Sequence, residues 1–244
     1  MNNTIWIKLS ELSLPLKILF SFFLITIGIG YIVALFNLFI VYNLTDGKPG
    51  LTADDLRRAF YGDRSNTRLA AKINGGSMSQ YLPKPGDKEI VLNWIQDGAL
   101  EDEYIANVKP ILERNCIRCH ARGGISAFQP LTDYANVMNV VKVDRGEPIG
   151  LWARVAHTHI QSIGLIFLAL GFIFLLTSYS NKFKIIVISI AYLSLIFDFG
   201  SRFAAKYIPG IVYLMLVTGA LVGLSIATMI LLPLFEIWIR KEKT

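Results

Sequence analysis

The apolar stretch at residues 18–42, ILFSFFLITIGIGYIVALFNLFIVY, decides what kind of fold this chain forms. It contains no charged residue, and a helix needs about 20 such residues to cross a hydrocarbon core of about 30 Å. Three more long apolar stretches follow, at residues 160–179, 185–203 and 211–238. The sequence therefore predicts four transmembrane helices and an all-α fold.

Composition and charge agree with a membrane protein. Hydrophobic residues make up 53% of the 244 residues and charged residues only 17%, which is too apolar for an ordinary soluble domain. The net charge of +6 suggests a nucleic-acid partner, but residues 43–156 contain 15 basic and 14 acidic side chains, a balanced surface. We therefore exclude nucleic acid as a partner and expect the lipid membrane instead.

The excess basic residues predict the orientation, because lysine and arginine collect on the cytoplasmic side of a membrane. They lie beside the apolar stretches, at Lys8, Lys17, Lys182, Lys184, Arg240, Lys241 and Lys243. We expect residues 1–42 to be a cytoplasmic N-terminus with an uncleaved signal anchor, and residues 43–156 to be a domain outside the membrane. Residues 157–244 are then a three-helix membrane region with a cytoplasmic C-terminus.

Residues 43–156 contain short helical patterns separated by turn signals. Thr52 is placed to cap one helix, and Asp87 is placed to cap another after a turn at residues 83–86. No strand pattern competes with these helices. We therefore expect a small, helical domain inserted between the first and second membrane helices.

Cys116, Cys119 and His120 form the sequence Cys-Ile-Arg-Cys-His, the attachment sequence of a c-type haem. Two thiols three positions apart bond to one porphyrin, and the next histidine is the proximal ligand of the iron. The chain has only two cysteines, which excludes a four-cysteine zinc site, and a redox dithiol does not explain the histidine. We expect one covalent haem c, and its attachment on the outer face of a bacterial cytoplasmic membrane agrees with the predicted orientation.

Further segments resemble a bacterial cytochrome c domain. Residues 108–120, VKPILERNCIRCH, look like its opening, and PLTDY at residues 130–134 looks like a downstream segment. KEIVLNWIQDGA at residues 88–99 resembles the closing helix, and GSM at residues 76–78 resembles the methionine-ligand loop. The closing half precedes the opening half. The resemblance therefore implies a membrane-anchored monohaem c-type cytochrome, in which either the domain is circularly permuted or one of the matches is accidental.

The order of the two halves decides the candidates for the sixth iron ligand. In the permuted domain the ligand is Met78, and thioether ligation raises the reduction potential. In the ordinary order, residues 150–156 lead into a loop where His157 or His159 replaces methionine, and Met138 is a third candidate. His157 and His159 are also candidates for a second haem or metal site, or for interfacial histidines bonded to headgroups and water.

We expect single-electron transfer rather than an enzyme, because no nucleotide loop, catalytic triad or substrate pocket is evident. Four helices exceed the anchor that one haem needs, so other redox or membrane subunits of a respiratory complex are expected partners. The alternative is a haem enzyme or gas-responsive protein whose iron keeps an open position. Asp198 and Arg202 lie one helical turn apart and are expected to form an ion pair.

Overall fold

The structure is a computed structural model, and it describes residues 8–43 and 45–240. These residues form helices and turns, and the β structure among them is an isolated bridge between Thr67 and Val143. The chain divides into two compact units. The bundle unit comprises the described parts of residues 1–38, 149–204 and 211–244, and the insert unit comprises those of residues 39–148 and 205–210.

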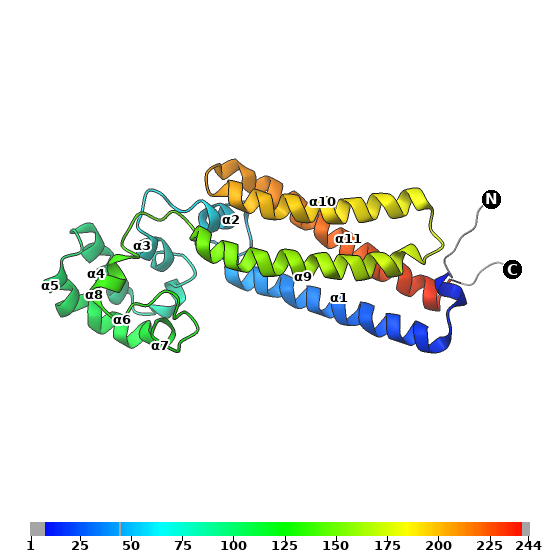
Figure 1. The fold of residues 1–244 in the computed structure, drawn as a ribbon. Helices are drawn as coiled ribbons and strands as arrows, with labels where there is room; N and C mark the ends of the chain where they lie inside the picture. Colours follow the sequence, from blue (N-terminus) through cyan, green and yellow to red (C-terminus); the bar gives the residue numbers. More distant parts are fainter. Residues whose placement is uncertain (1–7, 44, 241–244) are drawn as a thin grey trace. The chain divides into compact units, whose positions relative to one another are not determined.

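Four long helices meet the length and composition needed to cross a membrane (Figure 1). They are α1 (Leu14–Tyr42), α9 (Ile149–Leu175), α10 (Asn181–Ala205) and α11 (Val212–Trp238). The prediction of four such helices in an all-helical chain is confirmed. However, α9 begins well before the apolar stretch at residue 160, because Trp152 and Ala156 provide a buried face that extends the helix toward its N-terminus.

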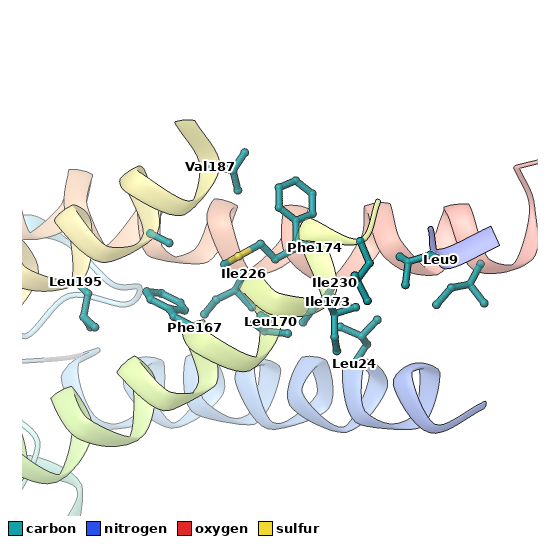
Figure 2. Packing of buried hydrophobic residues seen from close by; sticks show 14 of the residues in the cluster. Leu9, Leu24, Phe167, Leu170, Ile173, Phe174, Val187, Leu195, Ile226 and Ile230 are labelled. Carbon is teal, nitrogen blue, oxygen red and sulfur yellow. The ribbon is translucent and has the colours of Figure 1, made fainter. Parts of the chain in front are cut away.

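The core of the bundle unit is filled by large apolar side chains (Figure 2). Leu24 of α1 and Ile226 of α11 belong to the same buried cluster as Phe167, Leu170 and Phe174 of α9. Three hydrogen-bonded contacts also join the elements at one end of the bundle. The Leu9 amide donates to the carbonyl of Leu176 over 3.0 Å. The Trp238 indole donates to the Ser21 hydroxyl over 2.8 Å, which links α11 to α1. The α9–α10 turn bonds to α11 through Ser178 and Glu236, as described below.

Short helices make up the insert unit. They are α2 (Ala53–Phe60), α3 (Arg68–Ile73), α4 (Pro85–Gln96), α5 (Glu101–Glu103), η3 (Tyr104–Val108), α6 (Lys109–Asn115), α7 (Ile117–His120) and α8 (Tyr134–Met138). The remaining short turns of helix in the chain are η1 (Leu9–Glu11), η2 (Ser79–Tyr81) and η4 (Pro209–Ile211). The elements α5, η3 and α6 follow one another without a break, so a single helical stretch with a π-helical middle leads toward Cys116.

One of the two predicted helix caps is confirmed and the other is wrong. The Thr52 hydroxyl accepts from the Asp55 amide at the start of α2, and the Asp55 carboxylate bonds back to the Thr52 amide in a capping box. Asp87, in contrast, lies within the first turn of α4, because Pro85 begins the helix two residues earlier. A proline at the first helical position has its φ already set for a helix.

The insert unit has its own apolar core. Val91, Val108 and Val137, from three different helical segments, are fully enclosed in it. The segment at residues 205–210, between α10 and α11, belongs to this unit as well. The Lys206 ammonium donates to the carbonyl of Glu147 over 2.5 Å and also to that of Arg145. The connection between two membrane helices is thereby tied to the residues that precede α9.

Candidate functional site

The two cysteines lie on one helical turn. Cys116 stands between α6 and α7, and its carbonyl accepts from the amides of Cys119, at 3.1 Å, and His120, at 2.9 Å. Both thiols are free and half-buried. The turn therefore presents two thiols and an imidazole from five consecutive residues.

The His120 ring is oriented by the backbone. Its Nδ1 lies 2.8 Å from the carbonyl oxygen of Gln129. Because a carbonyl oxygen only accepts, Nδ1 carries the proton and the lone pair of the ring is on Nε2. A hydrogen bond of this kind is the usual partner of a metal-ligating histidine, since it fixes the tautomer and the plane of the ring. The His120 carbonyl also accepts from the Leu131 amide over 3.0 Å.

The loop after His120 folds back onto the attachment turn. The Ser126 amide donates to the carbonyl of Cys119 over 2.9 Å. A Cβ atom at Gly124 would lie 2.3 Å from that same oxygen, so the close approach requires glycine. The two cysteines and the histidine are evident from their motif, whereas the part of this loop in holding them is evident only in the fold.

Burial, followed by the neighbouring Cys119 thiol, raises the pKa of the Cys116 thiol to about 11. Redox-active thiols in Cys-X-X-Cys motifs have a lowered pKa, because the thiolate is their nucleophile. The environment of Cys116 is therefore the opposite of the one found in a thioredoxin-like dithiol.

Met78, the first candidate for the sixth ligand, lies in a fixed segment of the insert unit. Its amide donates to the carbonyl of Lys72 over 3.0 Å. Gly76 makes this turn possible, because a Cβ there would lie 2.5 Å from the carbonyl oxygen of Ala71. The half-buried Met78 packs against the same apolar core that Cys116 contacts. Met138, the third candidate, contacts this core too.

Three helical segments lie side by side in the insert unit. The Trp94 ring, in α4, lies 5.8 Å from that of Tyr104, in the stretch that leads to Cys116. The Tyr104 ring lies 5.5 Å from that of Tyr134, in α8. The Tyr134 hydroxyl in turn donates to the carbonyl of Ala99 over 2.8 Å. The residues around Trp94, Tyr104 and Tyr134 thus form one packed group.

His157 and His159 belong to the bundle unit, whereas His120 belongs to the insert unit. Both lie inside α9 and both are exposed. Side chains two positions apart on a helix point about 200° from one another, so the two rings do not face one ligand. His159 Nδ1 donates to the Val155 carbonyl over 2.9 Å. In the part of the chain that the structure describes, no three His, Cys, Asp or Glu side chains gather as a protein-only metal site.

The expected pair in α10 is confirmed. The Arg202 guanidinium donates to Asp198 Oδ2 through Nε, at 2.9 Å, and Nη2, at 2.8 Å. The Thr218 hydroxyl of α11 lies 3.5 Å from the other carboxylate oxygen, Oδ1. The Asp198 side chain is buried, so both of its oxygens face polar groups of the bundle itself.

A second buried carboxylate of the bundle unit, at Glu236, was expected to have no special role, and the structure shows that it holds a turn. Glu236 of α11 accepts from the Ser178 amide, at 2.8 and 2.9 Å, and from the Ser178 hydroxyl, at 2.8 Å. The Lys184 ammonium donates to the carbonyls of Leu175, at 2.8 Å, and Thr177, at 2.5 Å, at the C-terminal end of α9. The one signal in the sequence is a carboxylate inside an otherwise apolar stretch.

Comparison with known proteins identifies the membrane part of the chain. Residues 148–244 are similar to a family described as a transmembrane helical domain, and this range contains α9, α10 and α11. No curated protein and no solved structure matches the chain. Together with the four candidate membrane helices, this similarity makes the chain a multi-pass membrane protein.

Proposed function

We propose that the chain is a membrane-anchored c-type cytochrome that carries one haem and transfers single electrons. The observation that carries the proposal is the turn at Cys116, Cys119 and His120, with the His120 ring held by the Gln129 carbonyl. When bound, a haem supplies an iron that gains and loses one electron. The residues fit this group, because Nε2 of His120 is left with its lone pair for a metal.

Each residue of the turn has a separate role in the proposal. Cys116 and Cys119 hold the porphyrin through thioether bonds to their sulfurs. His120 binds the iron through Nε2, and the Gln129 carbonyl orients its ring. Leu131 and Ser126 donate backbone hydrogen bonds that keep the following loop against the turn.

A circularly permuted cytochrome c domain accounts for the order of the segments in the insert unit. The bond from Tyr134 to Ala99 supports this proposal because it joins the downstream segment to the segment that resembles the closing helix. Trp94 of the closing segment also packs against Tyr104, four residues before the opening segment. Permutation is tolerated when the natural ends of a domain lie near one another.

Covalent haem is tested by denaturing electrophoresis of the full chain followed by haem staining. We expect the stain to remain at the mass of the chain, and Cys116→Ala combined with Cys119→Ala to abolish it. The matched control is Ser126→Ala, which leaves both sulfurs in place. A colourless band from a host with active haem-attachment machinery would contradict the proposal.

Met78 is the proposed sixth ligand, since it contacts the same core as Cys116 and is held by the Lys72 carbonyl. A weak thioether–iron absorption in the red is expected in the oxidised protein, and Met78→Ala should remove it and lower the reduction potential. Met138→Ala is the matched control. Loss of the native spectrum in His157→Ala or His159→Ala instead would assign the ligand to α9.

Carbon monoxide binding by the unmodified protein would favour the alternative of an open iron, as in a haem enzyme or gas-responsive protein.

The proposed location is a bacterial cytoplasmic membrane, with the insert unit on its outer side. The contacts of Leu9, Ser178 and Glu236 support this orientation because they gather the segments that carry Lys8, Lys184 and Arg240 at one end of the bundle unit. Reporter fusions at residues 180–184 should give a cytoplasmic signal, and fusions at Gly86 an external one. Other redox or membrane subunits are proposed partners, because four candidate membrane helices exceed the anchor that one haem needs.

A further inference from the structure

A groove, named here the α1–α11 groove, runs between these two helices of the bundle unit. Its volume is about 590 Å³, and its walls include Ser21 and Ile25 of α1 and Leu231, Phe235 and Trp238 of α11. Leu231 is 62% exposed and Trp238 is 54% exposed, so the groove opens toward the outside of the helices. In a membrane that side is occupied by lipid, and a cavity of this size is typical of small-molecule sites.

The walls of the groove offer apolar contacts to an occupant. The Ser21 hydroxyl, which lines the groove, donates to the Lys17 carbonyl over 2.7 Å and accepts from the Trp238 indole over 2.8 Å. The hydroxyl and the indole N–H are therefore engaged by the two helices themselves. A polar group placed in the groove would lose its hydrogen bonds to water without replacement. The part of a ligand that lies there is therefore hydrocarbon.

The groove has one basic end. The helices α1 and α11 run in opposite directions, so the beginning of α1 lies beside the end of α11 (Figure 1). Lys17 lies one helical turn before Ser21, on the same face of α1. Tryptophan indoles such as that of Trp238 are enriched at the membrane–water interface. The groove therefore runs from the interface, at Lys17, into the hydrocarbon region, at Ile25 and Leu231.

The Lys17 ammonium is held in place and can bind an anion. Its Nζ donates to the Ser10 carbonyl over 2.8 Å, which uses one of its three N–H donors. Within residues 8–43 and 45–240, no carboxylate forms an ion pair with Lys17. Arg240, at the same end of the bundle unit, differs because it lies 3.6 Å from Glu236 Oε2 and stacks over the Tyr179 ring.

We propose that the α1–α11 groove binds an anionic phospholipid, with one acyl chain between Ile25 and Leu231 and the phosphate group beside Lys17. Basic pockets between membrane helices on the cytoplasmic side bind such headgroups. A zwitterionic lipid gains less, because its own cation opposes the ammonium. The inference goes beyond the proposed function, since it needs the membrane helices and not the haem.

A lipid in this groove joins α1 to the rest of the bundle unit. The buried side chains of α1 are Ser21 and Leu24, so this helix makes few enclosed contacts of its own. A molecule that contacts both α1 and α11 adds to them. Because a ligand of the folded state stabilises that state by mass action, the anionic lipid should raise the melting temperature of the chain.

The headgroup contact is tested by native mass spectrometry of the full chain in detergent, with equal amounts of dioleoyl phosphatidylglycerol and dioleoyl phosphatidylcholine. We expect one phosphatidylglycerol to be retained per chain, and Lys17→Gln to weaken its binding about fivefold. Lys17→Arg keeps the charge and should bind like the unmodified chain. The matched control is Lys182→Gln, at an exposed lysine in the first turn of α10, which should have no effect. Equal retention of the two lipids, or equal losses in both glutamine variants, would overturn the proposal.

The acyl-chain contact is tested by filling the groove. Leu231→Trp places an indole where the acyl chain would lie, and it should abolish both the retention of phosphatidylglycerol and the rise in melting temperature. Leu224→Trp is the matched control, because Leu224 is 65% exposed two helical turns earlier in α11 and lies outside the groove. Equal lipid binding by the two tryptophan variants would place the acyl chain elsewhere and sink the proposal.

Two other occupants of the groove have distinct signatures in the same spectra. Dimers of the unmodified chain that become monomers in Leu231→Trp would assign the groove to a second copy. Retention of an added uncharged prenyl quinone in preference to phosphatidylglycerol would assign it to a redox lipid. Either result overturns the anionic phospholipid as the occupant and leaves the proposed haem untouched.

Discussion

Helix α1 of the bundle unit carries large apolar side chains on its outside, whereas the insert unit encloses many of its own in a core. Phe22, Ile32 and Phe36 of α1 are all more than half exposed, while Val91 and Val108 of the insert unit are fully enclosed. Lipid is as apolar as these side chains, so the hydrophobic effect does not drive membrane helices together. The insert unit is stabilised by burial of apolar surface, and the bundle depends more on close packing and on its few polar contacts.

In both units a buried carboxylate accepts hydrogen bonds from the backbone of a turn, and Asp198 is the exception. Asp144 in the insert unit accepts from the amides of Asp63 and Gly146, both over 2.9 Å. Glu236 in the bundle unit likewise accepts from the backbone of a turn, at Ser178. Asp198 is the exception, because its donors are the side chains of Arg202 and Thr218. A carboxylate that holds a turn fixes where helices begin and end in either unit.

The largest effect is expected from replacing a core aromatic residue of the insert unit. Trp94 is buried, contacts the Tyr104 ring and donates to the Leu100 carbonyl. Trp94→Ala should lower the free energy of unfolding by about 3–5 kcal/mol. The matched change in α1, Phe36→Ala, should alter it by at most about 0.5 kcal/mol in nanodiscs, since lipid replaces the lost contacts. Near-ultraviolet circular dichroism during chemical denaturation measures both, and equal effects would remove the contrast between the units.

A smaller effect is expected from the carboxylate that joins α11 to the α9–α10 turn. Glu236→Ala leaves the amide and hydroxyl of Ser178 without their acceptor, which should cost about 1–3 kcal/mol of bundle stability. Glu236→Gln keeps an acceptor oxygen and should recover much of this loss. The measurement is the denaturation midpoint in nanodiscs, with proteolysis at residues 176–180 as a local readout. A Glu236→Ala variant as stable as the unmodified chain would show that the contact is dispensable.

Local patterns in the sequence predicted much of this structure, and contacts between distant residues account for what was missed. Length and hydropathy identify the four membrane helices, and the spacing of Asp198 and Arg202 predicts their pair. Glu236 and Ser178 meet across 58 positions, and no spacing rule connects them.

The candidate site was predicted to a similar extent. The sequence identified Cys116, Cys119 and His120, because a short motif carries all three. The carbonyl that orients His120 belongs to Gln129, and any residue there could supply it, so the sequence gives no signal. The early start of α9 was missed for a different reason. The buried face of Trp152 and Ala156 becomes apparent only once the neighbouring helices are in place.

A third expected effect is a pH dependence of the stability of the insert unit. In a chain produced without haem attachment, folded Cys116 keeps its proton up to a pKa of about 11, whereas the unfolded thiol loses its proton near 9.0. Between these values the unfolded state binds fewer protons than the folded state, so stability should fall as pH rises through this window. Denaturation midpoints of the insert unit, measured under reducing conditions from pH 8 to 11, follow the change.

Comparison with Cys116→Ala separates the thiol from Tyr104, whose pKa is also raised by burial and whose titration acts in the same direction. In Cys116→Ala, stability should keep the part of its pH dependence that Tyr104 causes and lose the part that the Cys116 thiol causes. The haem-attached protein should resemble the variant, because a thioether sulfur carries no proton. If all three proteins show the same slope, Cys116 is not buried as a neutral thiol in the haem-free fold. The attachment turn would then have to form only when the sulfurs are bonded, which would make the insert unit depend on the haem for the very turn that holds it.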